Sequence, residues 1–219
     1  MTVKTRKVFE NLSEVKEKKE KTFSDYKIAD VLILLDLPPP LRWKLEFKSI
    51  DPSPFLTYGL QQALIQITSD SNEQEQRFFM ELFFMEALVN HKLRMWQERP
   101  LDAGKSPFRG IIDFALTPYQ PKFKTPYLVL SEAKKDDFEQ GWGQCLLAMK
   151  TCQMLNEQEG LKFDIHGIVS TGKFWEFGKL TVDNQFYTTA GYALAQPDML
   201  LGAVDYMFTL CENNIPNTT

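Results

Sequence analysis

The chain has 219 residues, of which 43% are hydrophobic and 13% aromatic, enough for one sizeable core. Its formal net charge of −4 argues against a protein that coats nucleic acid through bulk charge, although a local basic groove stays open. Three cysteines without CxxC spacing indicate reduced thiols, and no apolar run reaches the length of a membrane span. Because the N-terminal stretch lacks the apolar core of a signal peptide, we expect a cytoplasmic protein without a membrane partner.

The N-terminal stretch differs in charge from the rest of the chain. Residues 1–21 carry seven lysines and arginines against four glutamates, which is typical of a solvated helix or arm. The alternative is a basic arm that contacts phosphate. We therefore expect a charged extension over residues 1–22 and a single domain over residues 23–219.

The first half of the domain reads mainly as helices. A helix over 25–35 ends before Pro38, an alternating pattern over 43–50 predicts an edge strand, and Ser53 with Pro54 predicts a helix start. That helix should run to about Thr68. The capping-box sequence over residues 71–74 predicts a long, buried helix to about Trp96, followed by a loop over 97–107.

The second half alternates strands and helices. A strand over 109–117 and the apolar run from Tyr127 flank a proline-rich turn, so they can pair antiparallel. Further elements follow in order: a helix over 137–158, a hairpin over 165–180 around Thr171 and Gly172, a short strand near 185–187, and a helix over 196–211. The fold class expected is mixed α/β with an antiparallel pair at its centre.

A possible catalytic group lies on that central strand pair. Glu132 and Lys134 are two residues apart at the end of one strand, so their side chains should share a face. Pairing with the preceding strand can bring Asp113 beside Glu132. Two carboxylates suit Mg²⁺ or Mn²⁺, and the Lys134 ammonium beside the metal can orient or deprotonate water. The pattern predicts metal-dependent hydrolysis of a phosphodiester.

Asp113, a turn and then Glu132-Ala133-Lys134 resemble the PD-(D/E)xK nuclease superfamily, whose members share the restriction-endonuclease-like fold. In that superfamily a helix carrying glutamine often follows the second acidic strand, and here Gln140 and Gln144 lie one turn apart on the following helix. The resemblance covers about residues 71–180 and extends to a group of small cyanobacterial proteins. It implies a mixed central sheet flanked by helices.

This chain departs from the superfamily pattern at one position, because Ile112 precedes Asp113 where the pattern has proline. The resemblance also implies a further acid from the preceding helix. The candidates there are Glu73, Glu75, Glu81 and Glu86. We favour Glu86, because it shares a helical face with apolar residues and would be a buried carboxylate that needs a partner. Glu81 has Arg77 four residues back and can pair with it.

The leading expectation is a Mg²⁺- or Mn²⁺-dependent nuclease acting on DNA. Asp113 and Glu132 would hold the metal, Lys134 would activate water, and Glu86 and Gln144 would tune the site. Arg109, Gln140 and the N-terminal lysines are candidate contacts to nucleic acid. A homodimer is compatible with this activity, because cutting both strands of a duplex at once takes two sites. The sequence leaves open single-stranded against double-stranded DNA, and DNA against RNA.

Simpler interpretations stand beside each of these residues. Glu132 and Lys134 can be a solvated pair on an edge strand, and Asp113 can be a buried acid that caps a loop. His91 and His166 have no Cys or His partner at zinc spacing, so we expect both to be structural or surface groups. The rival functions are a catalytically silent nuclease-like binding module and an interaction protein whose aromatic-rich helix forms an oligomer interface.

Overall fold

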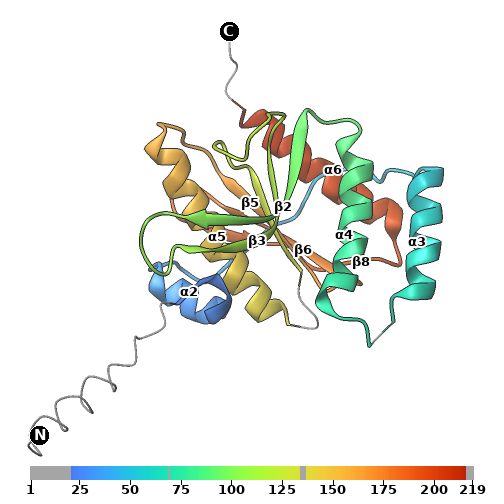
Figure 1. The fold of residues 1–219 in the computed structure, drawn as a ribbon, viewed down its shortest axis with the longest axis horizontal. Helices are drawn as coiled ribbons and strands as arrows, with labels where there is room; N and C mark the ends of the chain where they lie inside the picture. Colours follow the sequence, from blue (N-terminus) through green and yellow to red (C-terminus); the bar gives the residue numbers. More distant parts are fainter. Residues whose placement is uncertain (1–20, 69, 134–136, 216–219) are drawn as a thin grey trace, which may run out of the picture.

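The computed structural model describes residues 21–68, 70–133 and 137–215, and for residues 129–133 it describes the backbone alone. A mixed sheet is covered by helices on both faces (Figure 1), which confirms the mixed α/β class. The helices are η1 (Phe23–Asp25), α2 (Ile28–Leu34), α3 (Pro54–Gln66), α4 (Glu73–Leu88), α5 (Phe138–Gln158) and α6 (Pro197–Asn213). The strands are β1 (Leu41–Arg42), β2 (Leu93–Asp102), β3 (Arg109–Pro118), β4 (Val129–Ala133), β5 (Ile165–Ser170), β6 (Phe174–Leu180), β7 (Phe186–Thr188) and β8 (Tyr192–Ala193).

The strands lie in the order β1-β7-β6-β5-β4-β3-β2, with β8 paired to β6 off this path. Strands β2, β3 and β4 form an antiparallel meander, and α5 then crosses over so that β5 runs parallel to β4. Strands β5 and β6 form an antiparallel hairpin. The predicted antiparallel pair, the helix after it and the later hairpin are therefore confirmed, and β2 is the last strand at one edge of the sheet.

Two hydrophobic cores lie on opposite faces of the sheet. Helices α3, α4 and α6 pack on one face around Phe84 and Trp175, which are at most 1% exposed. Helices α2 and α5 pack with η1 on the other face around Leu146 and Phe186. The sheet is the middle of three layers, as Figure 1 shows with α4 and α6 on one side and α5 on the other.

Local sequence signals explain where α3 and α5 begin. The Ser53 side chain accepts hydrogen bonds from the backbone of Phe55 and Leu56, and Pro54 occupies the first turn, as predicted. Asp137 caps α5 in the same way by accepting from the backbone N–H of Gln140. Helix α5 begins at Phe138, five positions after the last residue of β4.

The structure corrects the predicted end of the long helix. Helix α4 ends at Leu88 and strand β2 begins at Leu93, so the helix does not reach Trp96 and most of the predicted loop over 97–107 is strand. No glycine or proline marks this boundary in the sequence. Strand β2 exists because it pairs along its length with β3, a long-range contact that overrides the local helical pattern.

Three smaller predictions also change. Residues 43–50 form no strand, because the pairing of this segment with β7 stops at β1. The expected helix over 25–35 divides into η1 and α2. Asn72, rather than Ser71, is the N-cap of α4, with its capping box closed by Glu75. Ser71 instead accepts a hydrogen bond from the backbone of Thr68.

Candidate active site

Asp113 lies where strands β2 and β3 twist sharply. Ile112 and Phe114 are two residues apart on β3 but pack in opposite cores, which regular alternation does not allow. In the backbone pairing with β2, Phe114 lies opposite Gln97 and Ile112 lies opposite Arg99. The residues between these two pairs are not paired with each other. At that gap Glu98 has a φ of +49°, a left-handed conformation that is uncommon outside glycine. This distortion places Asp113, which is 9% exposed, on the side of α4.

The β3–β4 register brings the two predicted acidic positions opposite each other. Phe114 pairs with Ser131, and Leu116 pairs with Val129. Continued by one residue, this register sets position 132 across from Asp113, inside the bounds of both strands. The convergence of their side chains stays a prediction, because the side chain of Glu132 and the whole of Lys134 lie outside the described residues.

Arg77 of α4 neutralises Asp113. Its Nη2 lies 2.7 Å from Oδ1 of Asp113, and its Nη1 lies 2.9 Å from Oε1 of Glu98. The side chains of Arg77 and Asp113 are 13% and 12% exposed, so this charge pair is largely shielded from water. Arg77 thus forms its ion pairs with two strand residues rather than with Glu81, the partner considered from the sequence.

A small open pocket of about 180 Å³ surrounds this ion pair. Its lining residues come from α4, β2 and β3: Gln74, Arg77, Glu81, Gln97, Glu98, Asp113 and Phe114. Three carboxylates face one guanidinium in this lining, so the pocket carries an excess of negative charge. Such a pocket favours a cation over an anion.

The four glutamates of α4 have different surroundings. Glu86, favoured from the sequence, accepts hydrogen bonds from the backbone N–H and the hydroxyl of Ser53, at 2.9 and 2.8 Å. It holds the start of α3 and does not line the pocket of Asp113. Glu75 closes the capping box, and Glu73 lies in the first turn. Of the four, the structure brings Glu81 to the pocket.

The two glutamines of α5 do not line that pocket either. Gln140 donates from Nε2 to the backbone oxygen of Ser24 at 3.3 Å, so it ties α5 to η1. Gln144 is one turn farther along α5 and is 7% exposed. Arg109 lies opposite Asp102 in the backbone register, at the turn end of the β2–β3 hairpin. It is four residues before Asp113 along β3.

The donor set suits a hard divalent cation. Across the described residues, no three Asp, Glu, His or Cys side chains gather closely enough to hold a metal ion. Mg²⁺ does not need three, because it is usually bound by one or two carboxylates together with water and phosphate oxygens. Asp113 with Glu132 across the strand pair would meet that requirement, while Arg77 competes for the same oxygen of Asp113.

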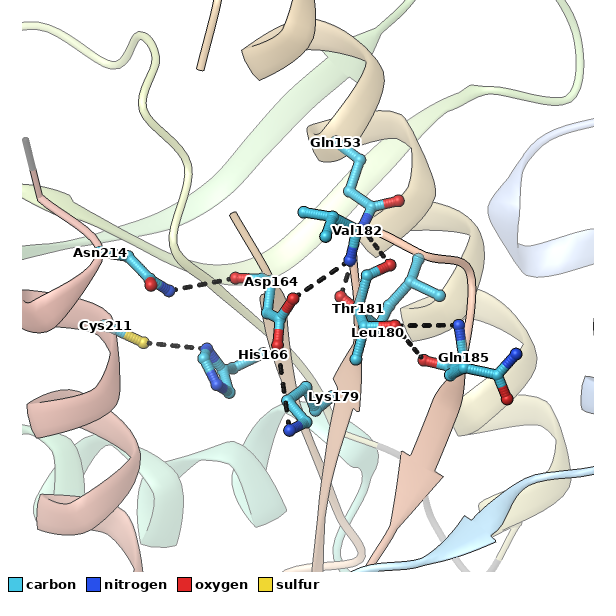
Figure 2. A network of polar contacts seen from close by, with 10 residues as sticks. All are labelled: Gln153, Asp164, His166, Lys179, Leu180, Thr181, Val182, Gln185, Cys211 and Asn214. Carbon is cyan, nitrogen blue, oxygen red and sulfur yellow. Dashed lines mark hydrogen bonds and ion pairs between the residues drawn. The ribbon is translucent and has the colours of Figure 1, made fainter. Parts of the chain in front are cut away.

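Both histidines have structural surroundings. Figure 2 shows His166 pointing toward Cys211, with its Nδ1 3.7 Å from the sulfur. Burial, and then the charge of Lys179, lower the pKa of His166 to about 3, so it is neutral at pH 7. Burial also raises the pKa of the Cys211 thiol, which keeps the sulfur protonated. This buried pair lacks the thiolate that nucleophilic chemistry requires.

His91 joins the turn after α4 to helix α6. Its Nε2 lies 2.9 Å from Asp205 and its Nδ1 lies 2.8 Å from Glu212, while its side chain is 5% exposed. Each ring nitrogen of His91 thus contacts one carboxylate of α6. This arrangement fixes α6 against the start of β2.

Sequence reasoning missed Arg77 and Glu98 as members of the site. Glu98 was assigned to a loop, and its place beside Asp113 follows only from the β2–β3 register. The available signal for Arg77 was its spacing of four residues from Glu81 on one helical face.

Neither a family model nor a curated protein matches this chain. None of the described helices is both long and apolar enough to cross a membrane.

Proposed function

We propose that the protein is a metal-dependent nuclease that hydrolyses phosphodiester bonds in DNA. The observation that carries this proposal is the β3–β4 register, which sets position 132 across from Asp113. The acidic pocket at Asp113 supports it, because negative charge attracts the divalent cation that such a reaction uses. The order of elements supports the restriction-endonuclease-like core: two acidic strands, a crossover helix and a hairpin.

Each residue has a distinct role in this proposal. Asp113 and Glu132 would hold Mg²⁺, which supplies Lewis-acid stabilisation of the charge that develops on the phosphate. Lys134 would orient the attacking water and accept its proton. Glu81 takes the position first considered for Glu86, because Glu81 lines the pocket and Glu86 is bound to Ser53. Arg77 is a positioning residue that holds the Asp113 carboxylate.

A cleavage assay tests the proposal directly. Purified protein is incubated with supercoiled plasmid, single-stranded DNA and RNA, each with Mg²⁺, Mn²⁺ or EDTA. We expect cutting of DNA that requires metal, falls at least about a hundredfold in Asp113→Asn and Lys134→Ala, and is unchanged in the matched carboxylate variant Glu86→Gln. Cleavage that persists in Asp113→Asn would overturn the assignment.

The rival is a binding module that has the same fold without the chemistry. The observation that favours it is the ion pair between Arg77 and Asp113, since a guanidinium already occupies the oxygen that a metal needs. Thermal unfolding with Mn²⁺ separates the two, because a ligand that binds the folded state raises Tm. An active site predicts a Tm increase that Asp113→Asn abolishes, and a silent module predicts none.

Three of the four phenylalanines of the aromatic-rich helix α4 support folding rather than an oligomer interface, and the fourth, Phe78, is 43% exposed. Phe79, Phe83 and Phe84 of α4 are at most 1% exposed and pack in the core beneath α3 and α6. Their area is therefore used in folding and is not offered to a partner.

A further inference from the structure

The edge of the sheet next to the candidate active site carries a concentration of positive charge. Residues 92–97 and 119–127 contain four lysines and arginines and no acidic residue, in a chain whose net charge is −4. Arg99 on β2 adds a fifth cation. We name these residues the basic edge: Lys92, Arg94, Arg99, Lys122 and Lys124. All are exposed except Arg94, which is half-buried.

The fold brings the two basic segments together. The loop after β3 turns back onto the start of β2, where Tyr119 donates from its backbone to the oxygen of Lys92 at 3.0 Å. Arg94 donates from Nη1 to the backbone oxygen of Gln120, also at 3.0 Å. The nearby acid Glu212 accepts the backbone N–H of Lys92 and binds His91, so its charge already has partners. The loop that carries Lys122 and Lys124 thus lies against the start of β2, which carries Lys92 and Arg94.

Two arginines of the basic edge are held in place by Trp96. The guanidinium carbons of Arg94 and Arg99 lie 4.3 and 5.5 Å from the Trp96 ring centroid. Trp96 is 8% exposed and donates from Nε1 to the hydroxyl of Thr117, so the ring is fixed. Cation–π contact of this kind orients a guanidinium before any ligand arrives.

These observations indicate the sugar-phosphate backbone as the ligand. Proteins that bind single strands stack bases on exposed aromatic rings, but the Trp96 ring is buried under the arginines. Tyr119, at 78% exposed, is the large exposed aromatic side chain of this surface. Five cations beside one exposed ring suit the phosphates on the outside of duplex DNA better than the bases of a single strand.

We propose that the basic edge binds the phosphate backbone of duplex DNA and leads it to the pocket of Asp113. Arg94 lies four residues before Glu98 on β2, a separation of about 13 Å along a strand. Arg99 pairs with Ile112, the neighbour of Asp113, so the surface reaches the level of the pocket along β2. Because Trp96 packs in the core on the face opposite α4, the DNA would pass around the edge strand β2 to reach Asp113. Delivery to a cutting site rests on the proposed function, whereas binding by the basic edge does not.

Fluorescence anisotropy of a labelled duplex in EDTA tests binding without cleavage. The variant Lys122→Gln/Lys124→Gln is compared with Lys44→Gln/Lys48→Gln, which removes the same charge from two exposed positions between β1 and α3. We expect the basic-edge variant to weaken binding about tenfold and to lower the slope of log Kd against log salt by about 2. Adding Arg99→Gln should lower the slope by about 1 more. The control variant should bind like the wild type.

Three results would overturn the inference: equal weakening by both double variants, tighter binding of single-stranded DNA than of duplex, or no duplex binding by the wild type at low salt. The outcome is separable from that of the nuclease proposal. Binding that depends on the basic edge in a protein that never cuts would refute the nuclease and keep the surface. Cutting that needs Asp113 but ignores the basic edge would do the reverse.

Discussion

At the scale of single residues, the ion pair between Arg77 and Asp113 is a largely buried electrostatic contact of the pocket. Its two side chains are 13% and 12% exposed and their charged atoms are 2.7 Å apart. We expect Arg77→Met to lower the free energy of unfolding by about 3 kcal/mol, because the largely buried Asp113 would lose its contact with the Arg77 guanidinium. Urea unfolding measures the change.

A double-mutant cycle checks the cause. Combining Arg77→Met with Asp113→Asn should recover part of the loss, since the carboxylate that Arg77 contacts is then removed as well. Lys27→Met is the matched control, because its pair with Glu139 spans 3.9 Å between side chains that are 59% and 73% exposed. That control should change stability by at most about 0.5 kcal/mol. Strictly additive losses in the cycle would contradict the pairing.

His166 makes stability depend on acidity. Its pKa falls from an ordinary 6.5 to about 3 in the folded protein, so below pH 6.5 the unfolded chain binds a proton that the folded chain does not. The contribution of neutral His166 to the free energy of unfolding is complete above pH 6.5 and is lost as the pH falls toward 3. The loss attributable to this residue approaches about 5 kcal/mol.

Comparison with His166→Gln isolates the effect from the many carboxylates that titrate in the same range. Urea unfolding at a series of pH values should give a shallower decline for the variant between pH 6.5 and pH 4. Two parallel curves would show that His166 is not held neutral in the folded protein.

At the scale of elements, α5 is placed by a close backbone approach. A Cβ added at Gly143 would lie 2.3 Å from the backbone oxygen of Tyr26, just before α2. We expect Gly143→Ala to cost about 2 kcal/mol or more, because backbone must move to admit the methyl group. Gly191→Ala is the control, since the nearest atom there is 4.0 Å away. Thermal unfolding of both variants gives the comparison, and similar Tm values would argue against this packing.

The start of α3 depends on the hydrogen bonds of Ser53. Ser53 accepts from the helix backbone and donates to Glu86 of α4, so one hydroxyl joins two helices. We expect Ser53→Ala to lower stability by about 1 to 2 kcal/mol through loss of the cap. The nuclease activity proposed above should survive in Ser53→Ala at temperatures where the variant is folded. A loss of cleavage without a loss of stability would return Glu86 to the list of site candidates.

Elements with strong local signals were predictable. Helix α3 has an N-cap serine and proline in its first turn, and β3 has a long apolar run, so their bounds agree with the structure to within two residues. The β2 segment has no such signal, because its strand character comes from pairing with β3. The same reason hid Glu98 and the partners of Arg77, since both depend on register between distant segments. Asp113 could be proposed because it lies inside a well-marked strand.

At the scale of the whole molecule, two cores share one sheet, and the candidate site lies where the outer strands of that sheet distort. The basic edge and the acidic pocket share strand β2, and the basic edge adds the loop after β3 while the pocket adds β3 and α4. Opposite charges are therefore kept apart on a protein whose net charge is −4. A surface that was negative throughout would repel a polyanion, whereas a surface with a separate positive region can bind one.

The left-handed backbone conformation of Glu98 and the proline at position 100 affect the tendency of this protein to aggregate. Strand β2 ends the sheet, and a straight strand there would be a template for aggregation with another chain. Pro100 lacks an N–H, and the backbone at Glu98, with φ +49°, interrupts the line of donors. We expect Pro100→Val to scatter more light on prolonged warming than wild type, while the same exchange at exposed Pro39, outside the sheet, should not. Equal scattering would mean that the kink alone is a sufficient guard against fibril-like growth.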